Sequence, residues 1–361
     1  MKKLIIAVIV LALALGACSQ ARQKLTPQGN VDFKTAQVYY SQQNVERAEE
    51  YYTKVLADNP EHAISLRRMA DINLHKGENF PARAVEFNKN AFEMYTKAIK
   101  ITEAYENLTD DERLDLRDMK KRKESTWARI FKAGETAITD GNTKEAMDIF
   151  ELAHTLEPSR PEPMIRLKDI YMNELKDDAK AEEILLSLLK DDPDKLPYLL
   201  ETGAFYYNKA NYTEAAKYFE RVKTQTPTNI DNLLNLSSAY YELKDYDKAL
   251  EVTRLAMDLD PSNIDLVDNA KNIALMKGDK ELAITYLAQL IERRSTEDDF
   301  NDIAALLNEK QDFLELIKYA EKWYQWDNSN KFAIQYVILG AIQTKNKTLQ
   351  TKYENILKNI K

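Results

Sequence analysis

Apolar side chains recur along the chain at the spacing of one face of an α-helix, and short polar turns separate the stretches that carry them. Five times an alanine stands twelve residues before a proline; the prolines are Pro60, Pro158, Pro193, Pro227 and Pro261. The last three of these prolines are evenly spaced. A fixed period of about 34 residues predicts a stacked array of helical hairpins, which offers an extended surface to partners and is seldom a catalytic pocket.

Each position of the repeat has a physical role. The alanines are expected where two helices approach so closely that a larger side chain would force them apart. Four residues before each alanine, Asn or Asp ends the turn and caps the second helix, and the proline later stops that helix. The alanines are Ala48, Ala146, Ala181, Ala215 and Ala249, and Ala283 has the same place in a further unit without the proline.

This pattern resembles the tetratricopeptide repeat, a helix–turn–helix unit of about 34 residues. The units Leu196–Pro227 and Ile230–Pro261 match best, and the first of them has Gly203 at the small position of its first helix. In the unit Glu162–Pro193, Asp169 takes that position, so we expect its first helix to pack more loosely. The resemblance implies an all-α fold, a right-handed α-solenoid whose first helices line the concave side. Generic helical hairpins with an accidental spacing are the alternative.

Two regions break the period. In the first, the pattern predicts a long helical hairpin near residues 81–139. A capping-box signature at Thr109–Glu112 marks the start of its second helix, which continues for about 30 residues. The second region, 298–361, has helical patterning without a proline, as terminal units of solenoids often do because they cap the core. Its Trp323 and Trp326 are expected to pack in the core; anchoring a partner is the alternative.

The N-terminal residues look like an export signal. Lys2 and Lys3 precede an apolar run, Leu4–Leu15, that is too short to span a membrane. The sequence Leu-Gly-Ala-Cys that ends at Cys18 resembles the lipobox of bacterial lipoproteins. In that family the chain is cut before the cysteine, which then carries the lipid. An ordinary signal peptide with an incidental cysteine is the alternative.

These features divide the chain into five segments. The resemblance implies a protein anchored by acyl chains in the bacterial cell envelope, and Ser19 after the cysteine resembles outer-membrane sorting, with the protein facing the periplasm. The segments are a signal peptide at 1–17, the lipidated cysteine and a tether at 18–31, an N-terminal repeat unit with extended helices at 32–123, a regular array at 124–297, and a helical, repeat-like cap at 298–361.

Composition excludes several classes of function. With a net charge of −8, the chain is not expected to bind nucleic acid through bulk electrostatics. Cys18 is the only cysteine, so the fold has no internal disulfide. The three histidines, His62, His75 and His154, are far apart, and no glycine-rich phosphate loop is present. We therefore expect no enzyme activity, no metal and no cofactor.

The first helices of the repeats carry the candidate binding residues. Three tyrosine doublets fall on these helices, and the second member of each, Tyr40, Tyr207 and Tyr241, is expected to face the groove. Asn235 and Ser238 would add polar contacts. Packing of these tyrosines between units is the alternative. The expected partner is a protein or peptide of the cell envelope.

A basic run on the predicted long helix is a second candidate surface. Such a run is typical of a solvated face, and contact with anionic lipid headgroups or with an acidic partner is the more specific hypothesis. The run consists of Lys120, Lys121, Arg122 and Lys123.

Two functions fit these observations. The first is a lipid-anchored scaffold that mediates protein–protein interactions in the bacterial envelope. The alternative is an accessory lipoprotein of an outer-membrane transporter that binds peptide, glycan or another nutrient. Helical-repeat proteins of that second class carry large insertions that form the ligand site, whereas the connections here are short, which favours the scaffold.

Overall fold

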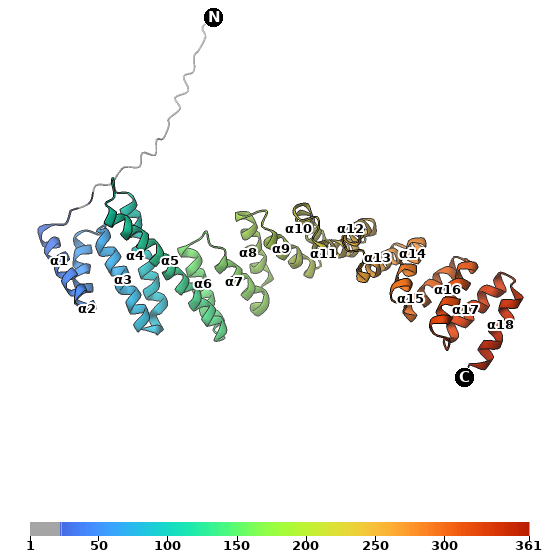
Figure 1. The fold of residues 1–361 in the computed structure, drawn as a ribbon. Coiled ribbons are helices and arrows are strands. Elements are labelled where there is room, and N and C mark those ends of the chain that lie inside the picture. Colours follow the sequence, from blue (N-terminus) through green and yellow to red (C-terminus); the bar gives the residue numbers. More distant parts are fainter. Residues whose placement is uncertain (1–21, 23, 361) are drawn as a thin grey trace, which may run out of the picture. The chain divides into compact units, whose positions relative to one another are not determined.

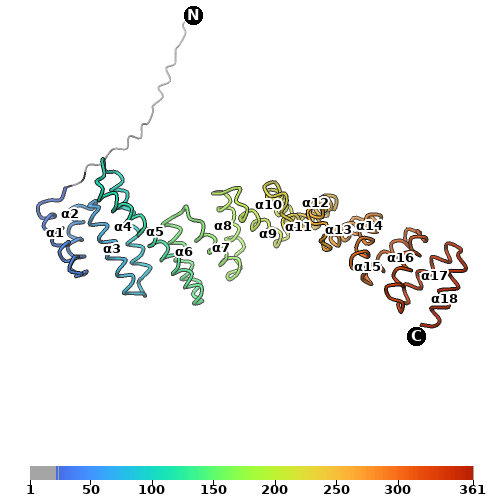
Figure 2. The backbone as a smooth tube through the Cα atoms, in the orientation of Figure 1, coloured from blue at the N-terminus to red at the C-terminus, as the bar shows by residue number. Residues whose placement is uncertain are grey.

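The computed structural model describes Arg22 and residues 24–360, and this part of the chain consists of helices and turns without a strand (Figure 1 and Figure 2). The all-α array of helix–turn–helix units expected from the sequence is therefore confirmed. The chain forms two compact units, Met1–Ile184 and Leu185–Lys361. The boundary between them lies inside α8, Asp178–Asp191.

In each unit, helices that follow one another along the chain pack side by side. The first unit contains α1 (Pro27–Ser41), α2 (Val45–Asp58), α3 (Ala63–Asn79), the 3-10 turn η1 (Pro81–Arg83), α4 (Ala84–Glu103), α5 (Asp110–Thr139), α6 (Thr143–Leu156), α7 (Glu162–Ile170) and the π-helical turn η2 (Tyr171–Leu175). The second contains α9 (Leu196–Asn208), α10 (Tyr212–Gln225), α11 (Ile230–Glu242), α12 (Tyr246–Leu259), α13 (Ile264–Lys277), α14 (Lys280–Arg293), α15 (Glu297–Glu309), α16 (Phe313–Trp326), α17 (Lys331–Gln343) and α18 (Lys347–Asn359).

The turn inside each repeat has one backbone geometry. The residue before the capping Asn or Asp has a positive φ, which reverses the chain between the two helices of the unit. Only two of these eight residues are glycine, so six turns hold a side chain in the left-handed region. The eight residues are Gln43, Gly141, Lys176, Ala210, Lys244, Gly278, Gln311 and Lys345.

Close packing inside the repeats depends on pairs of small and large side chains. All six alanines singled out in the sequence have no exposed surface. A Cβ atom at Gly203 on α9 would lie only 2.5 Å from Cε1 of Phe219 on α10, and Gly134 faces Phe150 in the same way at 2.7 Å. In the next repeat, α11–α12, a hydrogen bond of 2.7 Å between the Ser237 and Thr253 side chains replaces this contact. In these repeats, a small residue on the first helix therefore leaves the space that a larger side chain of the second helix fills.

The unit with Asp169 differs as its sequence suggests. Its first helix, α7, has only nine residues and continues into the π-helical turn η2. Asp169 is partly exposed and pairs with Lys168 at 3.0 Å. A carboxylate at the small position cannot enter an apolar helix contact without losing hydration, so it stays at the surface of this unit.

The long hairpin predicted near residues 81–139 is present. Its first helix begins at Ala84 after the 3-10 turn, and its second, α5, has 30 residues. The Thr109 side chain accepts from the Glu112 amide, and the Glu112 carboxylate accepts from the Thr109 amide, as the capping-box signature predicted.

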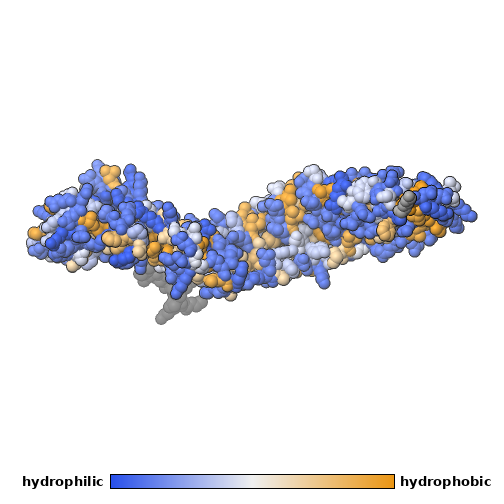
Figure 3. Space-filling view, turned by 90° about the horizontal axis from the view of Figure 1, so that it is seen from below, coloured by the Kyte–Doolittle hydropathy of each residue, from blue (hydrophilic) through white to orange (hydrophobic). Residues whose placement is uncertain are grey.

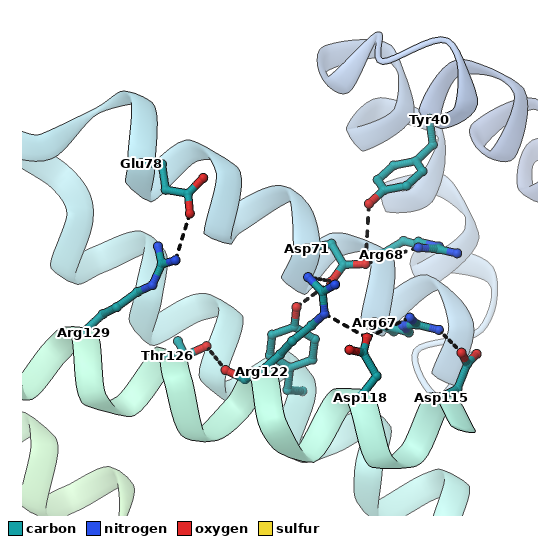
Figure 4. Close-up of polar contacts among 11 residues, drawn as sticks. Tyr40, Arg67, Arg68, Asp71, Glu78, Asp115, Asp118, Arg122, Thr126 and Arg129 are labelled. Carbon is teal, nitrogen blue, oxygen red and sulfur yellow. Dashed lines mark hydrogen bonds and ion pairs between the residues drawn. The ribbon is translucent and has the colours of Figure 1, made fainter. Parts of the chain in front are cut away.

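A buried ion network connects α1, α3, α4 and α5 (Figure 4). At its centre, the Asp71 carboxylate on α3 is only 6% exposed and accepts a hydrogen bond of 2.5 Å from the Tyr95 hydroxyl. Arg68 and Arg122 lie 3.3 and 3.5 Å from the same carboxylate. Burial, followed by the charge of Asp71, raises the pKa of Tyr95, so this phenol remains a neutral donor.

The predicted tether, 18–31, includes residues that belong to the first helix. Helix α1 already begins at Pro27, and the Thr26 side chain accepts from the Gly29 amide at 3.0 Å. Thr26 also donates to Asp58 on α2 at 2.9 Å. Threonine at the N-cap and proline in the first turn are a preferred start of a helix, and Thr26 and Pro27 form this pair. The start was missed because this stretch has few apolar residues.

Arg22, inside the same predicted tether, contacts the folded chain. Its guanidinium donates to both carboxylate oxygens of Glu112, at 2.8 and 2.6 Å, and lies 5.3 Å from the centre of the Tyr105 ring. The Arg22 hydrogen bond is the largest cause that lowers the pKa of Glu112 to about 2. Because this pKa lies below the ordinary value, the ion pair persists as pH falls through the usual carboxyl range and is lost only near pH 2.

The C-terminal region expected to be a cap contains two more helix pairs, α15–α16 and α17–α18. They repeat the same turn, with Asp312 and Asn346 as the capping residues. Where earlier units have a proline, the Asp327 carboxylate accepts from both the amide and the hydroxyl of Ser329, at 3.0 and 2.7 Å. Asp260 and Ser262 form the same side-chain turn beside Pro261, so this turn follows a second helix with or without the proline.

One face of the molecule shows how polar and apolar side chains are distributed on the surface. The face shown in Figure 3 is largely hydrophilic, and apolar side chains interrupt it in small patches. In the part of the chain that the structure describes, no helix combines the length and the apolar character that a membrane crossing requires. Trp323 is 1% exposed and stacks on Phe300, whereas Trp326 is 49% exposed, so core packing is right for only the first of these tryptophans.

Candidate partner-binding groove

A groove of about 440 Å³ opens along the second unit. Its walls come from three consecutive first helices, α9, α11 and α13, and from no second helix among its lining residues. This is the face on which the resemblance placed the binding surface. The lining residues are Tyr207, Leu234, Ser237, Ser238, Tyr241, Glu242, Asn269, Asn272, Ile273, Leu275 and Met276.

Two tyrosines expected to face a groove line this one. Tyr207 and Tyr241 occupy the same place on α9 and α11, one repeat apart, and both are partly exposed. Each ring meets the first tyrosine of its following second helix edge to face, Tyr212 at 5.3 Å and Tyr246 at 5.8 Å. One side of each ring therefore packs against the neighbouring tyrosine, and the other side lines the groove. Each tyrosine combines the two alternatives, packing and exposure to the groove.

The polar lining is broader than the sequence analysis proposed. Ser238 lines the groove, but Asn235 lies exposed on α11 outside the lining. Asn269 and Asn272 line it instead, and they stand exactly one repeat after Asn235 and Ser238 respectively. The repeat period could have predicted them, because residues one period apart occupy equivalent positions on successive first helices.

The floor and one rim of the groove are apolar. Leu234, Ile273 and Leu275 lie at or near the core, and Met276 is 55% exposed. Methionine has an unbranched and polarisable side chain that adapts to different partners. Aromatic rings, amides and an exposed methionine around an apolar floor are suited to an extended peptide rather than to a small polar molecule.

The groove has little acid–base chemistry. Burial is the largest cause that raises the pKa of the Tyr207 phenol, and the Glu242 carboxylate raises it further. Tyr207 is therefore a neutral hydrogen-bonding group at neutral pH. Among the described residues, no cluster of His, Cys, Asp and Glu side chains could hold a metal ion.

Tyr40 has a different environment from the other two tyrosines. It belongs to the first unit, where its hydroxyl lies 3.5 Å from Asp71 and its ring faces the guanidinium of Arg68 at 4.9 Å. Burial raises the pKa of Tyr40. Tyr40 therefore packs against charged groups of α3, and its place in a partner groove stays a prediction.

The basic run on α5 does not form a single patch. Successive residues of a helix point about 100° apart, so four neighbours face different sides. Lys120 pairs with Glu103 at 2.6 Å, Arg122 with Asp118 at 2.8 Å, and Lys123 with Glu157 at 2.5 Å. Lys121 remains exposed. Three of the four basic side chains thus form intramolecular ion pairs, and the hypothesis of a lipid-binding or acid-binding basic patch stays a prediction.

Cys18, the candidate lipidation site, and the signal segment 1–17 lie outside the described residues. Their roles stay predictions.

Comparisons with known proteins agree with the repeat architecture. Two family models, both described as tetratricopeptide repeat, match residues 137–201 and 209–272 in one case and residues 33–84 in the other. Together these segments comprise half of the 361 residues. Curated proteins give no significant match.

Several solved structures are similar to parts of the chain. MamA from Desulfovibrio magneticus RS-1 is 22% identical, with a TM-score of 0.40, over 48% of this chain and 97% of that one. PilF from Pseudomonas aeruginosa is 15% identical, with a TM-score of 0.37, over 62% and 98%. A structure of Naa15/Naa10 bound to HypK-THB is 16% identical, with a TM-score of 0.46, over 86% and 44%.

The helix pairs, their common turn, their buried alanines and the family models agree with one another. The chain belongs to the tetratricopeptide-repeat family.

Proposed function

We propose that the protein is a lipid-anchored scaffold of the bacterial envelope that binds a protein partner through the groove of its second unit. The observation that supports this most is that three consecutive first helices line one open groove with two tyrosines and two asparagines. Tyrosine combines a large apolar face with a polar end, and fixing it costs little side-chain entropy. Asparagine can donate to and accept from a peptide backbone.

The proposed role is binding rather than catalysis. The groove has neither a histidine nor a cysteine among its lining residues, and its carboxylate, Glu242, is exposed. Nucleophilic or general acid–base chemistry usually needs two such groups within hydrogen-bonding reach of each other. The short repeat turns also leave no large insertion in the described second unit for a nutrient or glycan site.

The proposed anchor is Cys18, and the position of Arg22 adds to this idea. If Cys18 carries the lipid, only three residues lie between it and Arg22, which forms the ion pair with Glu112. The four steps from Cys18 to Arg22 span at most about 14 Å. The end of the α4–α5 hairpin that contains Tyr105 would then be held close to the bilayer. The proposed membrane is the outer membrane, with the scaffold on its periplasmic side.

Affinity capture tests the groove. The full chain, solubilised from membranes in detergent, should retain a stoichiometric protein partner. The amount of partner recovered should fall by at least about tenfold with the double variant Tyr207→Ala/Tyr241→Ala, because aromatic residues at the centre of an interface contribute much of the binding energy. Circular dichroism should show unchanged helicity. Tyr319→Ala on α16 is the matched control, because Tyr319 is also a partly buried tyrosine but lies on a second helix. Equal partner recovery from the double variant and the wild type would refute the groove as the binding site.

A further inference from the structure

Charge is distributed unequally between the two kinds of helix in the second unit. The four first helices α9, α11, α13 and α15 carry ten Asp and Glu but only two basic residues, Lys271 and Lys277. The intervening second helices α10, α12, α14 and α16 carry nine acidic and nine basic residues. Five of the ten acidic residues lie on α9, α11 and α13, which line the groove, and the other five lie on α15, the next first helix along the chain.

Ion pairs remove the two basic charges but leave carboxylates unpaired. Lys271 pairs with Asp268 at 2.9 Å, and Lys277 pairs with Asp247 at 2.7 Å. Within the described residues, neither Glu242 nor Asp302 has a basic side chain within 4 Å. The groove lining thus keeps one carboxylate, Glu242, without a salt bridge, and Asp302 on α15 lies near Lys271 without pairing with it.

Helix stability does not explain these two carboxylates. Acidic residues in a first turn are favourable next to the positive end of the helix dipole, which accounts for others such as Asp231 and Asp265. Glu242 is instead the last residue of α11, where the dipole disfavours a negative charge. Asp302 lies in the middle of α15, where burial is the largest cause that raises its pKa and the charge of the nearby Lys271 partly offsets it.

Both carboxylates lie on the groove side of their helices. Glu242 lines the groove directly. Asp302 stands ten residues before the capping Asp312, as Asn269 stands ten residues before the capping Asp279. Because Asn269 lines the groove, the repeat extends the same face onto α15 with a carboxylate in place of the amide.

From this geometry we propose that the groove selects an extended peptide segment that carries basic residues next to an apolar or aromatic anchor. The proposal rests on the proposed function and names the chemistry of its partner. The anchor would lie between Tyr207, Tyr241 and Met276, and the basic side chains would reach Glu242 and Asp302. Charge complementarity of this kind sets partner choice and the rate of association.

A peptide selection tests this inference. The purified full chain in detergent is used to select from a random library of twelve-residue peptides displayed on phage, and peptides that the Tyr207→Ala/Tyr241→Ala variant still binds are discarded. The retained peptides should be enriched in Lys and Arg beside apolar residues. Their affinity should fall with added salt, and by about three- to tenfold with either Glu242→Gln or Asp302→Asn.

Asp258→Asn on α12 is the matched control, because Asp258 is an exposed carboxylate on a second helix and its loss changes the net charge equally. Retained peptides that are neutral or acidic would overturn the proposal, as would equal effects of the three charge variants. If no tyrosine-dependent peptide is recovered, the groove is not a peptide site, and the proposed function fails together with the inference.

Discussion

At the residue scale, the repeat depends on contacts between a small and a large side chain. Gly203 and Phe219 show the tightest of these, because the ring occupies the volume that a methyl group at Gly203 would need. Phe219 is 1% exposed and surrounded by core, so the ring has no free space into which it could move.

We therefore expect Gly203→Ala to destabilise the protein by about 1–3 kcal/mol through overpacking, although alanine is the better helix former. Phe219→Leu should relieve the clash, so that the double variant is more stable than the sum of the two single changes implies. Chemical denaturation of all four proteins measures this coupling. Additive effects would show that the two side chains do not meet.

At the scale of the element, the turn between the two helices of a repeat limits local stability. Ala210 has a φ of 55°, and its side chain is exposed, so no contact compensates for the left-handed backbone. This conformation costs a non-glycine residue about 1 kcal/mol.

Ala210→Gly should accordingly stabilise the protein by about 0.5–1 kcal/mol. The same exchange at the exposed Ala204, inside α9, should have the opposite sign and destabilise by about 1 kcal/mol. Thermal denaturation of the two variants compares them directly. A loss of stability in both would mean that the turn is not strained.

At the scale of the whole molecule, the chain has a polar helical array and a single cysteine that could hold it to a membrane. An apolar helix that could span a membrane does not occur among the described residues. The proposed lipid on Cys18 is the attachment that an experiment can test.

Cys18→Ser should move the protein from the membrane fraction to the soluble fraction, because acyl chains would supply the hydrophobic attachment. Fractionation followed by immunodetection measures the distribution, and circular dichroism of the variant confirms that helicity is retained. Ser19→Ala serves as the neighbouring control. Persistence of the Cys18→Ser protein in washed membranes would contradict the lipid anchor.

Several features could be derived from the sequence because they follow from local rules. The constant spacing of the prolines located the hairpins, and the capping box at Thr109 placed the start of α5. The two C-terminal repeats were less visible because they lack the proline landmark, although Asp327 and Ser329 form the same side-chain turn as Asp260 and Ser262. Asn269 and Asn272 were missed, although the period could have transferred Asn235 and Ser238 to them.

The sequence alone determined the helical array, because helix periodicity, caps and small residues act within one repeat of the chain. Only the tertiary structure decided which surface positions remain available, since that depends on neighbours distant in sequence. Tyr40 and Tyr241 occupy the same place in their repeats, but Asp71 and Arg68 of α3 meet the first, whereas a groove lies beside the second. Likewise, the run at Lys120 became a set of ion pairs because carboxylates from other segments reach it.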